Sequence, residues 1–453
     1  MKKIAFNRPL ILILILLFLS TSLNVSAAPT KNGTNGNTET KGLNLKKVTP
    51  ADRQAAADNL QLMLEAAGLT ALAPPSTFGT VTDPDTGYLV PDYFGSANWA
   101  YSPTNLRKFV DKLAGLGSAN TNLLGQYIPL AVPDTTTYTA NATTGAKASD
   151  YYEIAVVEYM EKMHSDLPAT KNRGYVQIHT AALPGVGVPL FQADGTTPIN
   201  YPGTATQILV VDKPHYLGPA IVSDSNKPVR VKFYNLLPIG TAGDLYIPVD
   251  KTVMGSGMGP TGEEYTENRA NVHLHGNNTV WISDGSPHQW ITPAGESTAY
   301  PQGTSVKGVP DMSDSNNSRD GTTTLYYTNS QSARLMFYHD HSFGITRLNV
   351  YAGEAAPYII RDDVEKDLMN GTNVTGVNPN AYKLPEIEIP LVIQDRTFVD
   401  STTILQTDPT WAWGSKPATP ATATTPYVAG TPVDGDLWYP HVYSPAQDPY
   451  DAD

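Results

Sequence analysis

The stretch SARLMFYHDH, residues 332–341, is a largely apolar run that ends in His339 and His341, with one residue between them. Side chains along a β-strand point alternately to opposite faces, so positions 333, 335, 337, 339 and 341 share a face. Only 9 of the 453 residues are histidine. Two of them at the end of one apolar strand predict a β-fold that presents imidazoles together.

A second histidine pair lies upstream in NVHLHG, residues 271–276. The same alternation sends His273 and His275 to one face and the apolar residues beside them to the other. The segment PVRVKFYNLL, residues 228–237, also alternates. Short alternating segments separated by Gly, Pro and Asp turns predict a β-sandwich or barrel.

The composition favours a globular, mainly β protein. Hydrophobic residues make up 40% of the chain and charged residues 16%, with Gly 36, Pro 37 and Tyr 25, which favours strands and turns. The absence of cysteine excludes disulfides, thiol nucleophiles, zinc–thiolate sites and iron–sulfur clusters within this sequence. A net charge of −13 is poorly suited to nucleic acid or anionic membranes, so neither is an expected partner.

Residues 1–27 have the features of a secretory signal peptide. Positive residues precede an apolar Leu/Ile run over 10–19, and the small residues Ser26 and Ala27 offer a cleavage site. The run is too short for a transmembrane helix, although an uncleaved anchor is the alternative. The protein is therefore expected to be secreted, periplasmic or attached to the cell surface.

The rest of the chain is expected to fall into further segments with different composition. Helices are predicted over 49–68 and 102–117, and a new strand over 385–399. The expected segments are a flexible stretch 28–48, a helical or irregular extension 49–120, a β-domain 121–364, a linker 365–383 and an incomplete second β-domain 384–453.

Two His-x-His pairs on neighbouring strands would place four imidazoles around one small volume. Imidazole suits copper and zinc, and copper(II) binds most tightly in the divalent series, but the spacing alone does not separate the two metals. A single pair is more often structural than metal-binding. Two pairs at the ends of apolar strands predict a metal site.

The two histidine motifs also resemble a known family. NVHLHG and FYHDHSFGITRLNVYAGEAAPYIIRD are similar to the first two copper motifs of the multicopper oxidases, in the branch of spore-coat laccase, bilirubin oxidase and phenoxazinone synthase. The resemblance spans roughly 106–400 and implies a cupredoxin-like Greek-key sandwich for 121–364 and the start of a second cupredoxin domain in 384–453. Other similar stretches, in the same order, are LRKFVDKL, DYYEIAVVEYMEKMHSDLP, LGPAIVSDSNKPVRVKFYNLLP, LYIPVDKTV, SDGSPHQW and LVIQDRTF.

The resemblance implies a role for each histidine of the two pairs. The implied copper ligands are His273 at a type 2 copper and His275, His339 and His341 at a type 3 pair. Asp284, in the SDG loop, resembles the acidic residue that supports proton delivery to oxygen. The alternative for Asp284 is a simple Asp-Gly turn.

Neighbouring polar residues receive other expectations. Asp340 is expected to point away from its flanking histidines and to bond to backbone or to groups behind the ligands. His288, in the same loop as Asp284, matches no ligand of the family. Arg347 and Asn349 are assigned to packing.

The resemblance also implies an activity that this sequence does not complete. In the family, electrons from a reducing substrate enter through a type 1 copper that needs a cysteine, and this sequence has none. The chain is therefore expected to be the N-terminal portion of a secreted multicopper oxidase, inactive alone, holding half of the ligands of the copper cluster that reduces dioxygen to water. Its expected partner is a C-terminal cupredoxin half. The alternatives are a secreted, non-catalytic copper-binding protein and a β-sandwich relic with a partner surface.

Overall fold

The chain forms two compact units in the computed structural model. Of the unit formed by 1–100 and 443–453, the structure describes one antiparallel strand pair, β1 (Thr80–Thr82) and β2 (Leu89–Pro91). The expected signal peptide, the flexible stretch and the first helix lie outside the described residues. The described part of the other unit comprises residues 106–107, 109–305, 309, 312, 320–385, 389–407, 411–419, 422 and 425–438.

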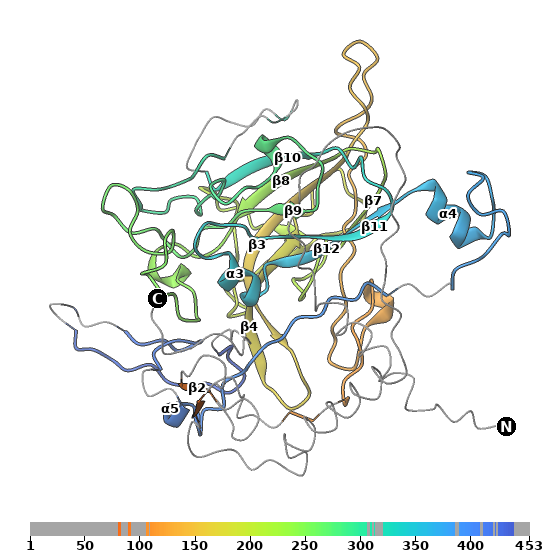
Figure 1. The fold of residues 1–453 in the computed structure, drawn as a ribbon. Helices are drawn as coiled ribbons and strands as arrows, with labels where there is room; N and C mark the ends of the chain where they lie inside the picture. The colour runs from red at the N-terminus through yellow and green to blue at the C-terminus, as the bar shows by residue number, and fades with distance from the viewer. Residues whose placement is uncertain are drawn as a thin grey trace, which may run out of the picture. The chain divides into compact units, whose positions relative to one another are not determined.

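The first of two four-stranded sheets is built around a long hairpin (Figure 1). Its strands β3 and β4 pair antiparallel, β3 pairs parallel with β8, and β8 pairs antiparallel with β10. In sheet order the strands are β10 (Thr322–Tyr327), β8 (Val229–Asn235), β3 (Asp150–Lys162) and β4 (Ala169–Gln177).

The second four-stranded sheet carries both histidine motifs. Its central strands β12 and β11 pair antiparallel, β11 pairs antiparallel with β9, and β12 pairs parallel with β7. In sheet order the strands are β7 (Ile221–Asp224), β12 (Ala355–Arg361), β11 (Arg334–His339) and β9 (His273–His275).

One hydrophobic core lies between the two sheets and receives side chains from every strand of both. Val231 and Phe233 of β8 and Leu274 of β9 are all buried in it, as the alternation in the sequence predicts. On β11, Met336 and Tyr338 point into this core, which leaves the odd-numbered positions of that strand for the opposite face. The two packed sheets confirm the mainly β sandwich class.

The remaining elements are short. Asp362 caps α4 by accepting a hydrogen bond from the Glu365 amide, and the helix ends at Gly371 in the left-handed conformation. These elements are β5 (Val188–Pro189), β6 (Leu209–Val210), η1 (Ser118–Asn120), η2 (Gly240–Gly243), η3 (Trp281–Ser283), α3 (Thr346–Ala352), α4 (Asp363–Asn370) and α5 (Ile404–Thr407).

The helix predicted over 102–117 is wrong for the part that the structure describes. Residues 109–117 form no helix, and Phe109 has a positive φ of 62°. Hydrogen bonds to the β3–β4 connection hold this segment instead: Asp111 accepts from Ser165 and Arg107 donates to Asp166. Tertiary hydrogen bonds therefore override a helical pattern that had no buried face to support it.

The strand predicted over 385–399 is also wrong in its described residues. The structure gives residues 389–399 no ladder, only an isolated bridge between Phe398 and Leu437. Large apolar side chains such as Leu391 and Ile393 are exposed there. An apolar alternating segment forms a strand only where another strand offers it backbone partners. The division at 365–383 into a linker and a second domain stays a prediction.

No helix in the described part of the chain has the length and apolar character needed to span a bilayer.

Candidate metal centre

The pairing of β9 with β11 brings the two histidine motifs together. In this ladder His339 lies opposite His273, and Phe337 lies opposite His275. Directly paired residues on one face lie close to each other. The sequence predicted that two His-x-His pairs on neighbouring strands would lie around one small volume, and this register places them side by side on the face that points away from the core.

The structure brings all four histidines into one cluster. The ring centroids of His273 and His341 are 4.6 Å apart, and those of His275 and His339 are 5.4 Å apart. His339 and His341 are separated by 5.4 Å between centroids. One ring nitrogen from each of His273, His275 and His339 lies within 4.8 Å of the others. This spacing lets several imidazoles converge on one ion or on adjacent ions.

Backbone carbonyls fix which nitrogen of two rings is protonated. Nδ1 of His273 lies 2.6 Å from the carbonyl oxygen of Asp284, and Nδ1 of His339 lies 2.6 Å from that of Asp340. A carbonyl oxygen only accepts, so each Nδ1 donates. Each Nε2 therefore keeps its lone pair for a metal, the arrangement that metal-binding histidines commonly adopt.

The nitrogen positions also fit a metal. Nδ1 of His275 and Nε2 of His339 are 3.2 Å apart. Two nitrogen ligands bound at about 2.0–2.1 Å to one ion are separated by roughly 3 Å, and an N–H···N hydrogen bond spans a similar distance. Nδ1 of His341 is buried and has no hydrogen-bond partner among the described residues. A buried nitrogen without a partner is costly unless something binds it.

Burial favours the neutral form of two of the clustered histidines, His339 and His341. The side chain of His339 is almost completely enclosed, and this burial lowers its pKa to about 4. Burial, followed by the neighbouring His273, also lowers the pKa of His341. Metal ions bind neutral imidazole, so a lowered pKa favours the metal-binding form.

The SDG loop places Asp284 beside His273. A carboxylate oxygen of Asp284 lies 3.7 Å from Nδ1 of His273, and the side chain is 38% exposed. The side-chain amide of Asn271 donates to the carbonyl oxygens of Gly285 and Ser286, which fastens the loop to the start of β9. Asp284 thus reaches both the histidine cluster and solvent. Its residue pair also forms the Asp-Gly turn that was the alternative, since Gly285 has a φ of 67°.

Two polar residues lie behind the histidines, Asp340 and Asn349, and only Asp340 behaves as the sequence predicted. Asp340 points away from its flanking histidines, as predicted, and is completely buried. Asn349 of α3 was assigned to packing, but its side-chain amide donates to the Asp340 carboxylate at 3.0 Å and to the Arg269 carbonyl oxygen at 3.2 Å. The roles of Asn271 and Asn349 were not visible in the sequence, because each depends on segments distant along the chain.

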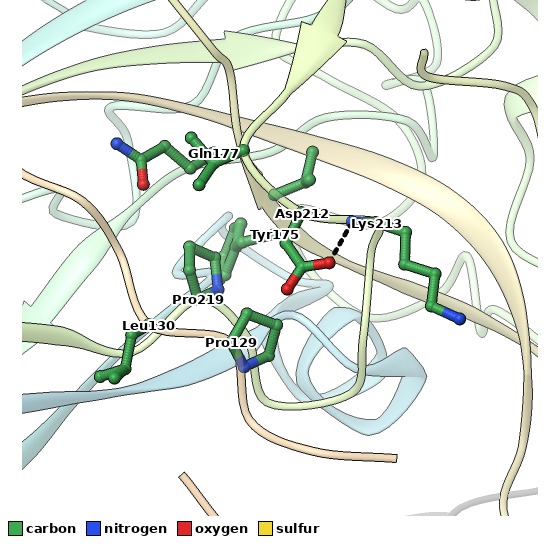
Figure 2. A pocket seen from close by; sticks show the side chains of 9 residues that line it. Pro129, Leu130, Tyr175, Gln177, Asp212, Lys213 and Pro219 are labelled. Atoms are coloured by element: carbon green, nitrogen blue, oxygen red, sulfur yellow. Dashed lines mark hydrogen bonds between the residues drawn. The ribbon is translucent and has the colours of Figure 1, made fainter. Parts of the chain in front are cut away.

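Two further features, the exposed His288 and a small pocket, contribute no ligands to the cluster. His288 is exposed and its ring lies against Phe343, with centroids 4.7 Å apart. A small pocket beside β4, lined by Pro129, Gln177, Asp212 and other residues, includes none of the clustered histidines (Figure 2). Its volume of about 10 Å³ is near the lower limit for one water molecule.

Comparison with known proteins finds sequence relatives among laccases and other multicopper oxidases. No protein-family model matches the chain. A laccase of Bacillus stratosphericus is 32% identical over 250 residues, 55% of this chain and 34% of the laccase. A laccase of Bacillus subtilis (strain 168) is 28% identical over 313 residues, 68% of this chain and 45% of the laccase. The multicopper oxidase LPR1 of Arabidopsis thaliana is 33% identical over 130 residues, 28% of this chain and 17% of that protein.

The chain thus spans less than half the length of these relatives. Among solved structures, a laccase of Pediococcus acidilactici is 18% identical, with a TM-score of 0.29 over 53% of this chain and 30% of the laccase. A TM-score this low does not support a structural relationship, so the relationship to known proteins rests on the sequence matches alone. Over the part of its length that these matches cover, the chain is similar in sequence to laccases and other multicopper oxidases, which supports a relationship to that family.

Proposed function

We propose that this chain is the N-terminal portion of a secreted, laccase-like multicopper oxidase and that it contributes half of the ligands of a trinuclear copper cluster. The convergence of four imidazoles on the outer face of one sheet supports this function most directly. In this proposal His273 serves a type 2 copper, and His275, His339 and His341 serve a type 3 pair. The basic and apolar start of the sequence supports export.

Copper bound here would supply the electron-transfer chemistry that reduces dioxygen to water while a reducing substrate is oxidised. The residues of this chain hold the site and deliver protons to it. His273 and His339 offer unprotonated Nε2 atoms because backbone carbonyls accept from their Nδ1 atoms. Water formation consumes protons, and Asp284 lies between solvent and His273, where it can pass them inward.

The surface around the histidines supports a protein partner. Phe337 stacks on His275 with centroids 4.6 Å apart and remains 41% exposed. Leu335 on the same face of β11 is 47% exposed. Exposed apolar side chains beside a polar site are typical of an interface. The proposed partner is a C-terminal cupredoxin half that supplies the remaining copper ligands and the cysteine of a type 1 site, which this sequence lacks.

A second candidate is a secreted copper-binding protein with no turnover. The same cluster supports it, because its imidazoles lie close enough together to bind copper without a partner. The two candidates differ in what the isolated chain does. As an oxidase portion it binds copper weakly and oxidises nothing, whereas a copper-binding protein holds copper tightly and in fixed stoichiometry.

The decisive experiment mixes the purified chain with a cysteine-containing C-terminal half of a related laccase in the presence of copper. We expect an intense blue absorption and oxidation of a phenolic substrate, neither of which the chain shows alone. Tight stoichiometric copper in the isolated chain, together with no activity in the mixture, would favour the copper-binding protein instead.

The ligands are tested on the isolated chain by titration with Cu(II). His339→Ala and His273→Ala are each expected to weaken Cu(II) binding by more than the 10- to 100-fold typical of losing a partner behind a ligand. His288→Ala is the control, because this exposed histidine lies outside the cluster. Equal losses in all three variants would mean that Cu(II) binds elsewhere.

A further inference from the structure

Asp340 lies between His339, the last residue of β11, and His341, and it is bonded more extensively than a spacer needs to be. Alternation along the strand directs Asp340 away from His339 and His341, into the protein. Its carboxylate is fully buried and accepts hydrogen bonds from three segments of the chain. The donors are the backbone amide of Asn271 at 2.8 Å, the Ser342 hydroxyl at 2.7 Å, the backbone amide of Ser342 at 2.9 Å and the side-chain amide of Asn349 at 3.0 Å.

These bonds continue the β9–β11 ladder past the point where it stops. The backbone pairing of the two strands ends at His339 opposite His273. His341 lies beyond it, and no backbone pair holds it against β9. The bond from the Asn271 amide to the Asp340 carboxylate joins the two segments at this position. This hydrogen bond holds Asn271, two residues before His273, next to Asp340, the residue before His341.

We propose that Asp340 is a positioning residue, which sets the two His-x-His segments against each other so that their imidazoles converge on one metal site. The proposal rests on the metal-binding function proposed above. Asp340 touches no metal and acts through the histidines on either side of it. It also acts through Asn271, whose side chain holds the loop that carries Asp284.

The four donors explain why this position needs a carboxylate. A carboxylate offers acceptors on both oxygens, whereas the amide of asparagine offers one oxygen and one donating NH₂ group. Two of the donors are backbone amides, of Asn271 and Ser342, which cannot reverse their role. In Asp340→Asn, the new side-chain NH₂ group therefore faces a backbone N–H group in a buried place, where neither can accept. The hydrogen bonds that hold the two histidine segments together are expected to weaken.

The test is Cu(II) titration of the full chain carrying Asp340→Asn, with the nitrogen splitting of the bound Cu(II) read by electron paramagnetic resonance. We expect a loss of affinity of about 10- to 100-fold, the range for groups behind metal ligands, and a spectrum with fewer coupled nitrogens. Wild-type affinity together with a wild-type spectrum in the variant would overturn the proposal.

Asp436→Asn is the matched control. Asp436 is also buried, and its carboxylate also accepts from a serine amide and hydroxyl, those of Ser415. Denaturant unfolding of both variants measures the loss of stability that the two substitutions share. Only Asp340→Asn is expected to change Cu(II) affinity and the nitrogen splitting. An equal affinity loss in Asp436→Asn would show that general destabilisation is the cause.

If Asp340→Asn does not fold, a milder variant still tests the positioning role of Asp340. Ser342→Ala removes one of the four donors and leaves the Ser342 amide in place. It is expected to weaken Cu(II) binding several-fold while retaining the fold, and unchanged affinity and spectrum would count against the proposal. A wild-type chain that binds no Cu(II) would instead contradict the proposed function, so the two failures are distinguishable.

Discussion

Replacing Gly285 with alanine is expected to lower the free energy of unfolding by roughly 2–5 kcal/mol and to weaken Cu(II) binding at the same time. Gly285 has a φ of 67°, in the left-handed region, which costs a residue with a Cβ roughly 1–2 kcal/mol. A Cβ at this position would also lie 1.8 Å from the carbonyl oxygen of Val272, the residue that directly precedes β9. Overpacking of this kind costs roughly 1–3 kcal/mol.

The clash falls on the backbone that carries the first histidine pair. The same Cβ would approach the Cα of His273 to 2.9 Å, so either β9 or the SDG loop has to move. Moving the loop withdraws the Asp284 carbonyl oxygen from Nδ1 of His273, which frees that ring to rotate. Denaturant unfolding and Cu(II) titration of Gly285→Ala measure the two effects separately.

Gly295→Ala separates the clash from the backbone strain. Gly295 has a φ of 82°, and a Cβ there would meet nothing within 4 Å. This variant is expected to lose only the roughly 1–2 kcal/mol that left-handed geometry costs and to bind Cu(II) like the wild type. Equal effects on stability and binding in the two variants would show that the contact with β9 has no consequence.

The strands that carry the site were predictable because their pattern is local. Val231 and Phe233 on β8 and Leu274 on β9 alternate with residues of the other face, and each is buried in the core as expected. Period-2 alternation reports which face a side chain takes without any knowledge of the partner strand. The histidine pairs could be placed on one face of each strand for the same reason.

Spacing predicted that the two pairs would surround one volume if their strands were neighbours, but it did not show the pairing of those strands or the groups behind the histidines. The pairing depends on the register that sets His339 opposite His273, a long-range property of the sheet. Asn271 and Asn349 gave no periodic signal, since their side chains bond across segments far apart in the chain. In its described residues, the helix predicted over 102–117 was wrong for a related reason: Asp111 and Arg107 bond to the β3–β4 connection.

Arg173→Met is expected to lower the free energy of unfolding by about 3–5 kcal/mol, the range for removing one partner of a buried ion pair. Arg173 is fully buried on β4, and its Nε donates to Glu158 at 2.9 Å. Its other nitrogens donate to the carbonyl oxygens of Gly243, Asp244 and Glu267. Methionine fills a similar volume, but it leaves these carbonyl oxygens without their donor.

Arg107→Met is the matched control, because Arg107 also pairs with a carboxylate, that of Asp166, but has a side chain 67% exposed. Water replaces the lost contacts at an exposed site, so its unfolding midpoint is expected to change little. Both variants lose an arginine that pairs with a carboxylate, so the comparison tests burial together with the bonds of Arg173 to three carbonyl oxygens. If Arg173→Met is as mild as Arg107→Met, Lys171, which lies 2.5 Å from Glu158, satisfies that carboxylate alone. In that case the bonds from Arg173 to the carbonyl oxygens of Gly243, Asp244 and Glu267 add little to the stability of the fold.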